Sequence, residues 1–294
     1  MGFRERRNSF VADMQSCEVV PPRVSALLMP LRSLVDSLSI RTNLPQIELA
    51  IGVNCVALTF RILEALSTAD EKQFRDFAER YGVRVYLQPG GLDTVSLFHP
   101  PGDASLHYTL ADFDLEFIFG ITDFTQVNFE INRVLVRRAL SLLDPQPGER
   151  IGDMFCGIGN FSLAIARCGA QVTGIEGNQA LVKRAASNAR HNQLEALCEF
   201  KPADLFKMDA GLWKGLGHFD KLLIDPPRDG AMDLVKAIGA ASPRRVAYVS
   251  CNPATLARDA AVMVHSHGYH LRTAGVVNMF PHTSHVESIA LFEK

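Results

Sequence analysis

The sequence predicts an α/β fold with a Rossmann-like sheet, preceded by a smaller α+β domain. From residue 150 onwards, strand-like runs, glycine turns and helical runs repeat in that order, as they do in parallel sheets. Before residue 122, strand-like runs surround a single helix without strict alternation, which is typical of an α+β domain. A helical run and the breaker Asp144-Pro145-Gln146-Pro147-Gly148 lie between the two patterns. We therefore expect one domain over residues 1–122 and a second over residues 123–294.

Composition restricts the class of protein. The chain has 294 residues, of which 47% are hydrophobic and 21% charged, so a sizeable core is expected. The net charge of −2 argues against a strongly basic nucleic-acid binder but leaves room for a local basic patch. The six cysteines show no C-x-x-C spacing, so we expect no zinc site, no disulfide framework and a reduced, cytoplasmic compartment. We expect neither a signal peptide nor a membrane span, because no suitable apolar run is found.

The sequence of the first domain has clear strand and helix signals but no motif that indicates a catalytic site. Its predicted helix starts at a capping box, Thr68-x-x-Glu71, and ends at Gly82. His99 and His107 stand alone in the sequence, and we interpret them as structural or surface residues. The expected strands form three hairpins in chain order and are Ile47–Ile51, Val56–Phe60, Val83–Leu87, Thr94–Phe98, Leu106–Leu110 and Leu115–Phe119.

A glycine-rich turn follows the first strand of the second domain. The strand Ile151–Phe155 leads into Cys156-Gly157-Ile158-Gly159-Asn160-Phe161, which opens a helix. The next strand, Gln171–Glu176, ends in an acid about twenty residues after the first, the spacing of sites that bind ribose hydroxyls. The turn lacks the Lys-Ser/Thr pair of a triphosphate-binding loop.

Further acids follow the next two strands. Asp204 comes after the third strand, and Asp225-Pro226-Pro227 follows the fourth. Because parallel strands end at one edge of the sheet, we expect these acids and the glycine turn to lie together, where open α/β sheets bind ligands. An NAD-binding domain would share the acid after the second strand, whereas Asp-Pro-Pro and the late strands favour S-adenosylmethionine.

Cys251 lies where the fifth strand ends and a helix begins. Arg245–Val249 is a short apolar run, Asn252 suits an N-cap and Pro253 suits the first helical position. The positive end of the helix favours a thiolate, so we expect a lowered pKa and a nucleophilic cysteine. The alternative is a small buried hydrophobic residue, which is what most free cysteines are.

Two more strands are expected after this helix, Tyr269–Met279 and His285–Phe292. Their connection is too short for a parallel crossover, so we expect them to be antiparallel. If the final strand inserts beside the fifth, Glu287 lies near Cys251, where a carboxylate can act as the base for a nucleophilic thiol. The alternatives are a solvated edge residue for Glu287, and loop ligands or RNA contacts for His282 and His285.

The motifs described above resemble those of the RNA (uracil-5-)-methyltransferases, and most closely those of the bacterial members that act on 23S rRNA. The resemblance extends over nearly the whole chain and is most specific around Cys251. The segments that carry it are Phe124-Thr125-Gln126-Val127-Asn128, Phe155-Cys156-Gly157-Ile158-Gly159-Asn160-Phe161, Asp225-Pro226-Pro227-Arg228, Ser250-Cys251-Asn252-Pro253-Ala254-Thr255-Leu256-Ala257-Arg258-Asp259 and Met279-Phe280-Pro281-His282-Thr283-Ser284-His285-Val286-Glu287.

The resemblance implies a class I S-adenosylmethionine-dependent methyltransferase fold, Rossmann-like, with a seven-stranded sheet whose last strand is antiparallel. It implies methyl transfer to C5 of a uridine through a covalent bond between Cys251 and C6, with Glu287 as the base. The implied partner is 23S rRNA. The resemblance also implies that the enzyme is a monomer, is cytoplasmic and does not bind a membrane. The implied contacts to S-adenosyl-L-methionine are Gln126, Phe155, Asn160, Glu176, Asp204 and Asp225.

The chain departs from the family pattern in two ways. Family members begin with a small β-barrel RNA-binding domain, which this sequence lacks. They also carry an iron–sulfur cluster on four cysteines, of which only the fourth has a counterpart here, Cys17. One cysteine cannot hold a cluster, so we expect no cluster and no other metal in this chain. These departures predict an N-terminally truncated member of the family.

Three other functions stay open at this stage. The substrate of a uracil-5-methyltransferase can be tRNA. An amino-group methyltransferase would also use Asp-Pro-Pro, but it would follow it with an aromatic residue where this chain has Arg228, and Cys251 would have no role. An RNA-binding module without activity need not bind the cofactor.

Overall fold

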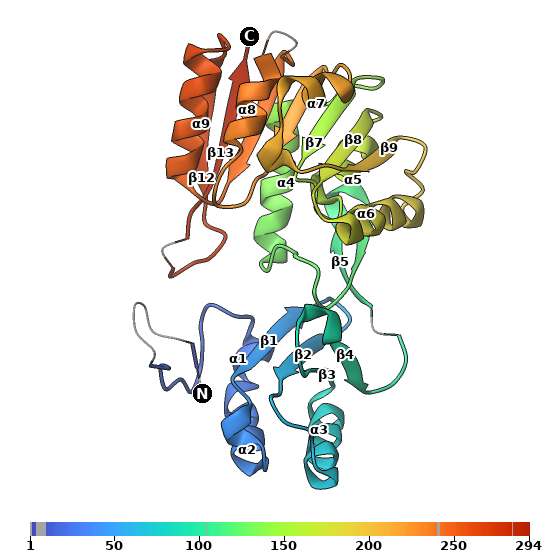
Figure 1. The fold of residues 1–294 in the computed structure, drawn as a ribbon, viewed down its shortest axis with the longest axis vertical. Coiled ribbons are helices and arrows are strands. Elements are labelled where there is room, and N and C mark those ends of the chain that lie inside the picture. Colours follow the sequence, from blue (N-terminus) through green and yellow to red (C-terminus); the bar gives the residue numbers. More distant parts are fainter. Residues whose placement is uncertain (1, 4–9, 104, 240–241, 284) are drawn as a thin grey trace. The chain divides into compact units, whose positions relative to one another are not determined.

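The computed structural model describes residues 2–3, 10–103, 105–239, 242–283 and 285–294 of the chain (Figure 1). Ser284, which belongs to one of the motifs above, lies outside the described residues. The chain forms two compact units, one of Met1–His107 with Gly120–Thr122 and one of Tyr108–Phe119 with Asp123–Lys294. Among the described residues, no helix is both long and apolar enough to cross a bilayer.

The first unit is built on a four-stranded sheet. Its elements are α1 Pro22–Ser25, α2 Leu28–Ser37, η1 Arg41–Asn43, β1 Gln46–Ile51, β2 Val56–Arg61, α3 Thr68–Tyr81, β3 Val83–Gln88, η2 Leu92–Thr94 and β4 Ser96–His99. The strand order is β1-β2-β3-β4, and the antiparallel pairs β1–β2 and β3–β4 confirm the expected hairpins. β2 and β3 are parallel, because α3 provides the crossover between them. Leu31, Phe60 and Phe74 lie in the core of this unit.

The capping box of α3 is formed by Ser67 and Asp70, so the prediction of Thr68 and Glu71 is wrong by one residue. Ser67 Oγ accepts the Asp70 N–H at 3.1 Å, and the Asp70 carboxylate accepts the Ser67 N–H at 3.2 Å. The same carboxylate accepts the Ser39 N–H at 2.8 Å. Burial opposes ionisation of Asp70, yet hydrogen bonds from the hydroxyls and the N–H groups of Ser39 and Ser67 to its carboxylate lower its pKa to about 2. The contact with Ser39 explains why Asp70, and not the neighbouring Glu71, is the acid of the capping box.

The second unit contains a seven-stranded sheet in the order β12-β13-β11-β10-β7-β8-β9. Its elements are β5 Leu106–Leu110, η3 Ala111–Phe113, β6 Leu115–Phe119, α4 Phe129–Leu143, β7 Arg150–Met154, α5 Asn160–Arg167, β8 Gln171–Glu176, α6 Gln179–His191, β9 Cys198–Pro202, η4 Leu205–Lys207, α7 Ala210–Gly215, β10 Lys221–Ile224, α8 Met232–Ile238, β11 Arg245–Ser250, α9 Pro253–His265, β12 His270–Val277 and β13 Glu287–Glu293. The ladders from β11 to β9 are parallel, whereas β13 is antiparallel to both of its neighbours. The expected sheet with its antiparallel last strand is confirmed.

Helices cover both faces of this sheet (Figure 1). α4 packs against α5, and α8 packs against α7 and α9. A large part of the core lies between the sheet and the helices α7, α8 and α9, where Trp213, Tyr248 and Phe292 are buried. Asn252 caps α9 and Pro253 is its first residue, as predicted. The side chain that follows β11 is therefore held between a buried strand and a capped helix.

The hairpin of β5 and β6 joins the second unit from Tyr108 onwards, whereas we expected the domain boundary at residue 122. Asn188 of α6 and Asn192, which caps the end of this helix, bind the backbone of the hairpin. Asn192 Oδ1 accepts the Glu116 N–H at 2.9 Å, and Asn188 Oδ1 accepts the Ile118 N–H at 3.0 Å. These bonds satisfy backbone donors of β6 that its own hairpin leaves unpaired, which explains the position of the boundary.

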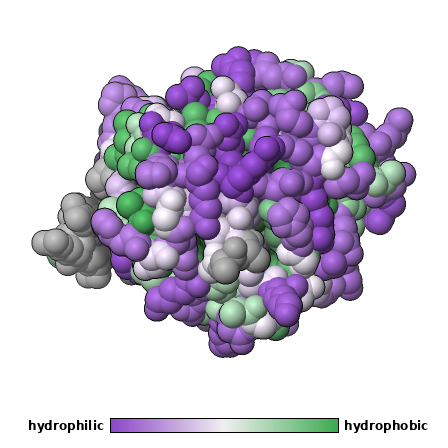
Figure 2. All heavy atoms as spheres, turned by 90° about the horizontal axis from the view of Figure 1, so that it is seen from above, coloured by the Kyte–Doolittle hydropathy of each residue, from purple (hydrophilic) through white to green (hydrophobic). Residues whose placement is uncertain are grey.

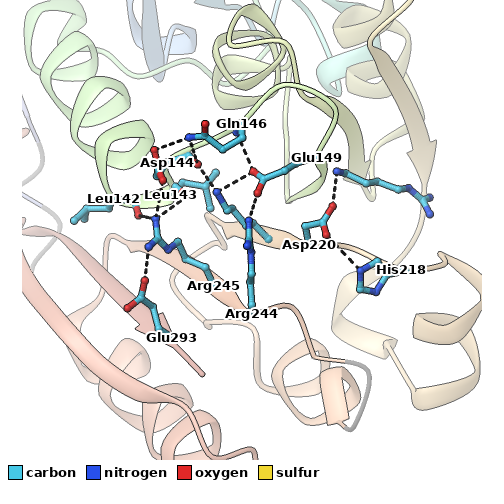
Figure 3. Close-up of polar contacts among 12 residues, drawn as sticks. Leu142, Leu143, Asp144, Gln146, Glu149, His218, Asp220, Arg244, Arg245 and Glu293 are labelled. Carbon is cyan, nitrogen blue, oxygen red and sulfur yellow. Dashed lines mark hydrogen bonds and ion pairs between the residues drawn. The ribbon is translucent and has the colours of Figure 1, made fainter.

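Charged side chains form a network at the amino edge of the sheet (Figure 3). Lys221 is only 2% exposed, and its Nζ lies 2.8 Å from Glu149 Oε2. Glu149 also pairs with the exposed Arg244, and Arg245 pairs with Glu293 at 2.5 Å. The network neutralises a buried lysine at the edge opposite the one described next.

The face of the molecule seen in Figure 2 is largely hydrophilic, and its coloured apolar residues lie in small groups.

Candidate active site

The segments that follow the parallel strands gather at the carboxyl edge of the seven-stranded sheet (Figure 1). Each carries a residue singled out by the sequence, since parallel strands direct the segments after them to the same edge. These residues are Phe155 and Asn160 after β7, Glu176 at the end of β8, Asp204 after β9, Asp225 after β10 and Cys251 after β11. Glu287 reaches this edge as the first residue of the antiparallel β13.

Glu176 is held against the glycine turn between β7 and α5. Its Oε2 accepts the Gly157 N–H at 3.1 Å, and its Oε1 accepts the Asn178 N–H at 2.8 Å. Phe155, Gly157 and Gly159 all have positive φ, so the chain turns sharply beside this carboxylate. A Cβ added at Gly157 would meet nothing within 4 Å, which leaves open space at the turn. An acid beside such a space suits hydrogen bonds to ribose hydroxyls.

Phe155 and Phe206 form an aromatic pair at the same edge. Their ring centroids lie 5.5 Å apart, and Phe206 is 45% exposed although it is a large apolar residue. The neighbouring Asp204 uses its carboxylate locally, since it accepts the Phe206 N–H at 3.1 Å and pairs with Lys207. Sequence reasoning missed Phe206, although an aromatic residue two positions after the acid was a usable signal. The pair offers a flat apolar contact of the kind that purine rings stack against.

Asn160 is the first residue of α5, and its side chain is tied to two other residues. It exchanges two hydrogen bonds of 3.0 Å with the amide of Asn132, and its Oδ1 accepts the Tyr108 hydroxyl at 2.9 Å. Sequence reasoning missed both partners, because a tyrosine in an apolar strand and an asparagine within a helix carry no local signal of a site.

Gln126 lies in the segment before α4, where it is half-buried. The nearby Asn128 caps α4 and donates a hydrogen bond to the Met279 carbonyl at 3.2 Å. This bond ties the segment to the connection between β12 and β13, and so to the approach of β13 toward the site. Gln126 therefore lies two residues from a side chain that anchors this segment to the connection leading to Glu287.

Cys251 directly follows β11, and Glu287 is the first residue of β13. The antiparallel register pairs Ser250 with Ser288, and the next position along brings Cys251 opposite Glu287. Glu287 is 4% exposed, and burial followed by the charge of Asp225 raises its pKa to about 7. Asp225 keeps part of its surface exposed, yet the protein packed around its carboxyl raises its pKa to about 7. The sheet thus brings together the thiol and the carboxylate that the sequence suggested as a pair.

The pKa of Cys251 is raised, so the expectation that the helix end lowers it is wrong. Burial is the main cause, and the charges of Glu287 and Asp225 add to it, while the Arg228 guanidinium acts in the opposite direction. The acids come from β13 and from the segment after β10, so they are distant in sequence. Their combined effect with burial outweighs the α9 N-terminus, which Asn252 already caps.

The segment after β10 is held firmly beside Cys251. The Arg228 carbonyl accepts hydrogen bonds from Asn252 Nδ2 at 3.0 Å and from Thr255 Oγ1 at 3.2 Å. The Arg228 guanidinium lies 2.7 Å from His285 Nδ1, on the connection that leads to Glu287. Because Asn252 and Thr255 belong to the cysteine motif, part of that motif positions a cation next to the thiol.

Asp259 closes the same motif in a structural role. It is fully buried, and its Oδ2 accepts the Tyr248 hydroxyl and the Ala231 N–H, both at 2.7 Å. Arg258 donates to its Oδ1 at 2.9 Å and to the Asp229 carbonyl at 2.8 Å. These bonds connect β11, α9 and the segment after β10, and so fix the walls around Cys251.

Cys17 belongs to the first unit, whereas the residues described above belong to the second. It lines an apolar hollow of about 640 Å³, and its N–H donates to Ser25 Oγ at 2.8 Å. Within the part of the chain that the structure describes, no three His, Cys, Asp or Glu side chains are grouped so as to hold a metal. The described residues around Cys17 therefore do not fit an iron–sulfur cluster on their own.

Comparison with known proteins identifies related sequences. The sequence model of the family described as tRNA (Uracil-5-)-methyltransferase matches residues 106–294. The chain is 59% identical over 295 residues to the 23S rRNA (uracil(1939)-C(5))-methyltransferase RlmD of Aromatoleum aromaticum. It is 57% identical over 293 residues to the protein of the same name from Dechloromonas aromatica. Both similarities cover all of this chain and 68% of the relative.

Solved structures share the fold. The Pyrococcus abyssi tRNA (uracil-54, C5)-methyltransferase, in complex with S-adenosyl-L-homocysteine, is similar with a TM-score of 0.78 and 26% identity, over 99% of this chain and 72% of that chain. The M. jannaschii tRNA m1G37 methyltransferase has a TM-score of 0.59 at 12% identity, over 93% of this chain and 78% of that chain, and shows a shared fold alone.

Proposed function

This chain belongs to the tRNA (uracil-5-)-methyltransferase family, and from that membership we propose that it methylates C5 of a uridine in 23S rRNA. The product is 5-methyluridine, and the methyl donor is S-adenosyl-L-methionine. The observation that carries the proposal is the position of Cys251 opposite Glu287 at the carboxyl edge of the sheet. The choice of 23S rRNA over tRNA rests on the names of the relatives that are 59% and 57% identical. We also propose that the enzyme acts as a cytoplasmic monomer.

The cofactor would be held by the residues around the glycine turn. Glu176 would accept the ribose hydroxyls, and Phe155 would provide an apolar contact for the adenine ring. Asn160, Asp204, Asp225 and Gln126 would complete the set. S-adenosyl-L-methionine supplies an electrophilic methyl group when it is bound. The fit rests on the open space at Gly157 beside a carboxylate that accepts hydrogen bonds.

Cys251 would begin the reaction by adding to C6 of the uracil. C5 of uracil is a weak nucleophile, and a new bond between Sγ and C6 moves the C5–C6 electron pair into an enolate. The thiol must first lose its proton, which burial and the neighbouring acids oppose. The Arg228 guanidinium acts in the other direction, so we assign to it the stabilisation of negative charge beside Cys251.

Glu287 would complete the reaction as the base. Once the methyl group has passed to C5, with S-adenosyl-L-homocysteine as the leaving group, C5 carries both that group and its original hydrogen. The Glu287 carboxylate removes the C5 proton, the C5–C6 double bond forms again, and the bond between C6 and Sγ breaks to release the thiolate. A pKa of about 7 suits this step, because general bases work best near the operating pH.

The uridine must be accessible from both faces of its ring. The thiol adds from one side at C6, while the methyl group and the base act at C5. A base stacked in a helix exposes neither face, so the substrate would be a looped-out or flipped uridine.

Labelled methyl transfer to RNA from a strain that lacks the enzyme tests the proposed function. Incubation with labelled S-adenosyl-L-methionine and total RNA should place the label in 5-methyluridine of 23S rRNA. Label in 5-methyluridine of tRNA would show that the substrate is tRNA and would contradict the choice of 23S rRNA. Label on an exocyclic amino group would contradict uracil C5 chemistry and the role of Cys251.

A further inference from the structure

Tyr108, Asn132 and Asn160 form a closed hydrogen-bonded group at the start of α5. Asn132 is 1% exposed and Tyr108 is 2% exposed, whereas Asn160 is half-buried at the carboxyl edge. The two asparagine amides exchange hydrogen bonds of 3.0 Å in both directions. Such a pair is symmetric, since both amides can turn over together and keep both bonds. The asparagines alone therefore do not decide which atom of Asn160 faces a ligand.

The hydroxyl of Tyr108 determines the orientation of the Asn160 amide. Its ring is stacked between Phe117 and Phe129, at centroid distances of 4.8 and 5.1 Å. Burial raises the pKa of this phenol, so it keeps its hydrogen and needs an acceptor. Among the described residues, the acceptor found for it is Asn160 Oδ1, at 2.9 Å. If the Asn160 amide were turned over, its N–H would face the hydroxyl, and the buried O–H donor of Tyr108 would have no acceptor. An unsatisfied buried donor of this kind costs about 1–3 kcal/mol.

The orientation of Asn160 determines the kind of ligand group that it can meet. Its Oδ1 already accepts from Tyr108 and from Asn132, and one hydrogen of its Nδ2 goes to Asn132 Oδ1. The second hydrogen of Nδ2 has no acceptor among the hydrogen bonds of the described residues. Asn160 therefore presents a donor. The backbone N–H groups at the start of α5 favour negative charge at the same place.

We propose that Asn132 and Tyr108 are positioning residues, which hold the Asn160 amide so that its N–H binds the carboxylate of the cofactor's amino-acid part. This inference rests on the proposed function. The ribose is assigned to Glu176 and the adenine ring to Phe155, so the carboxylate is the remaining group that needs donors. An ammonium group would require the acceptor Oδ1, which the two positioning residues already occupy.

Two ligands that differ only in the carboxylate test the proposal. S-adenosyl-L-homocysteine has it, and 5′-deoxy-5′-(3-aminopropylthio)adenosine lacks it but keeps the ammonium. In titration calorimetry, Asn132→Ala should weaken S-adenosyl-L-homocysteine about tenfold, by the loss of a hydrogen bond to a charged group. The aminopropyl ligand should keep its affinity within about twofold.

Tyr108→Phe gives a second, nearly isosteric test. Without the hydroxyl, both orientations of the amide pair have similar energies, and only about half of the molecules present the N–H. The affinity for S-adenosyl-L-homocysteine should then fall about twofold, again without change for the aminopropyl ligand. Phe117→Leu disturbs the same aromatic stack but keeps the hydroxyl, so it should leave the ratio of the two affinities unchanged.

The outcomes separate this inference from the proposed function. Equal losses for both ligands in Asn132→Ala and Tyr108→Phe, or no loss for either, would overturn the positioning role. A changed affinity ratio in Phe117→Leu would show that packing alone produces the effect and would overturn it as well. If the unaltered chain binds neither ligand, the proposed methyltransferase function fails, and the inference fails with it.

Discussion

Ser250 on β11 lies directly opposite Ser288 on β13, in the antiparallel ladder that closes one side of the parallel strands. A shift of one residue would turn the side chains of β13 to the other face of the sheet. The register therefore decides whether the carboxylate of Glu287 meets the thiol of Cys251. Because β13 is buried along most of its length, its register is strongly specified.

We expect Glu287→Gln to stall as a covalent complex between Cys251 and methylated RNA. The amide cannot accept the C5 proton at a useful rate, so addition and methylation proceed but release does not. A denaturing gel with labelled 23S rRNA should show a shifted band for Glu287→Gln and none for Cys251→Ala. Retained binding of S-adenosyl-L-homocysteine by Cys251→Ala is the control for folding. Normal turnover by Glu287→Gln would contradict the role given to the carboxylate.

The rate of the reaction should rise with pH through about 7. The base must be ionised to remove a proton, and the pKa of Glu287 is about 7, so acidification below this value removes the active form. The raised pKa of Cys251 acts in the same direction. Single-turnover rates between pH 5.5 and 9, at saturating cofactor, would measure the profile.

Asp225→Asn provides the matched variant for this profile. Burial is the main cause of the raised pKa of Glu287 and the negative charge of Asp225 is the second, so removing this charge should move the acidic limb to lower pH. A limb that stays near pH 7 in this variant would contradict the electrostatic coupling. If the acidic limb of the unaltered enzyme instead lies near the ordinary pKa of a glutamate, the assignment of Glu287 as the base is contradicted.

Much of the fold could be predicted from the sequence, because its signals are local. The alternation after residue 150 predicted the parallel strands, and a short connection predicted the antiparallel β13. The capping box was misplaced because Ser67-x-x-Asp70 and Thr68-x-x-Glu71 both satisfy the pattern. The choice depends on Ser39, which comes from a distant part of the chain.

The parts that the sequence could not predict depend on contacts between distant residues. The placement of β6 depends on Asn188 and Asn192, about seventy residues later in the chain. The raised pKa of Cys251 depends on burial in the folded chain and on acids from two other segments, whereas its own segment shows only a helix N-terminus. Buried amides and phenols such as Asn132 and Tyr108 have no sequence signal that separates them from ordinary core residues.

Glu176→Ala should weaken S-adenosyl-L-homocysteine by about 1.5–3 kcal/mol, through the loss of charge-assisted hydrogen bonds to the ribose. The substitution also removes the acceptor of the Gly157 N–H, so the turn is affected too. Glu199→Ala, on the exposed side of β9, is a matched control and should leave the affinity unchanged. Calorimetry on both variants is the measurement. Equal dissociation constants for Glu176→Ala and the unaltered chain would remove Glu176 from the site.

The network at the amino edge should stabilise the second unit mainly through Lys221. This ammonium is buried, and its carboxylate partner is Glu149, which also binds the exposed Arg244 (Figure 3). Glu149→Gln leaves a buried positive charge without its counter-ion, so we expect a loss of about 2–4 kcal/mol in the free energy of unfolding. Arg244→Ala removes a partner whose side chain is 62% exposed, so its loss should stay below about 1 kcal/mol. Urea denaturation of the two variants would compare them directly, and equal losses would contradict the view that burial of Lys221, rather than the number of ion pairs, sets the contribution.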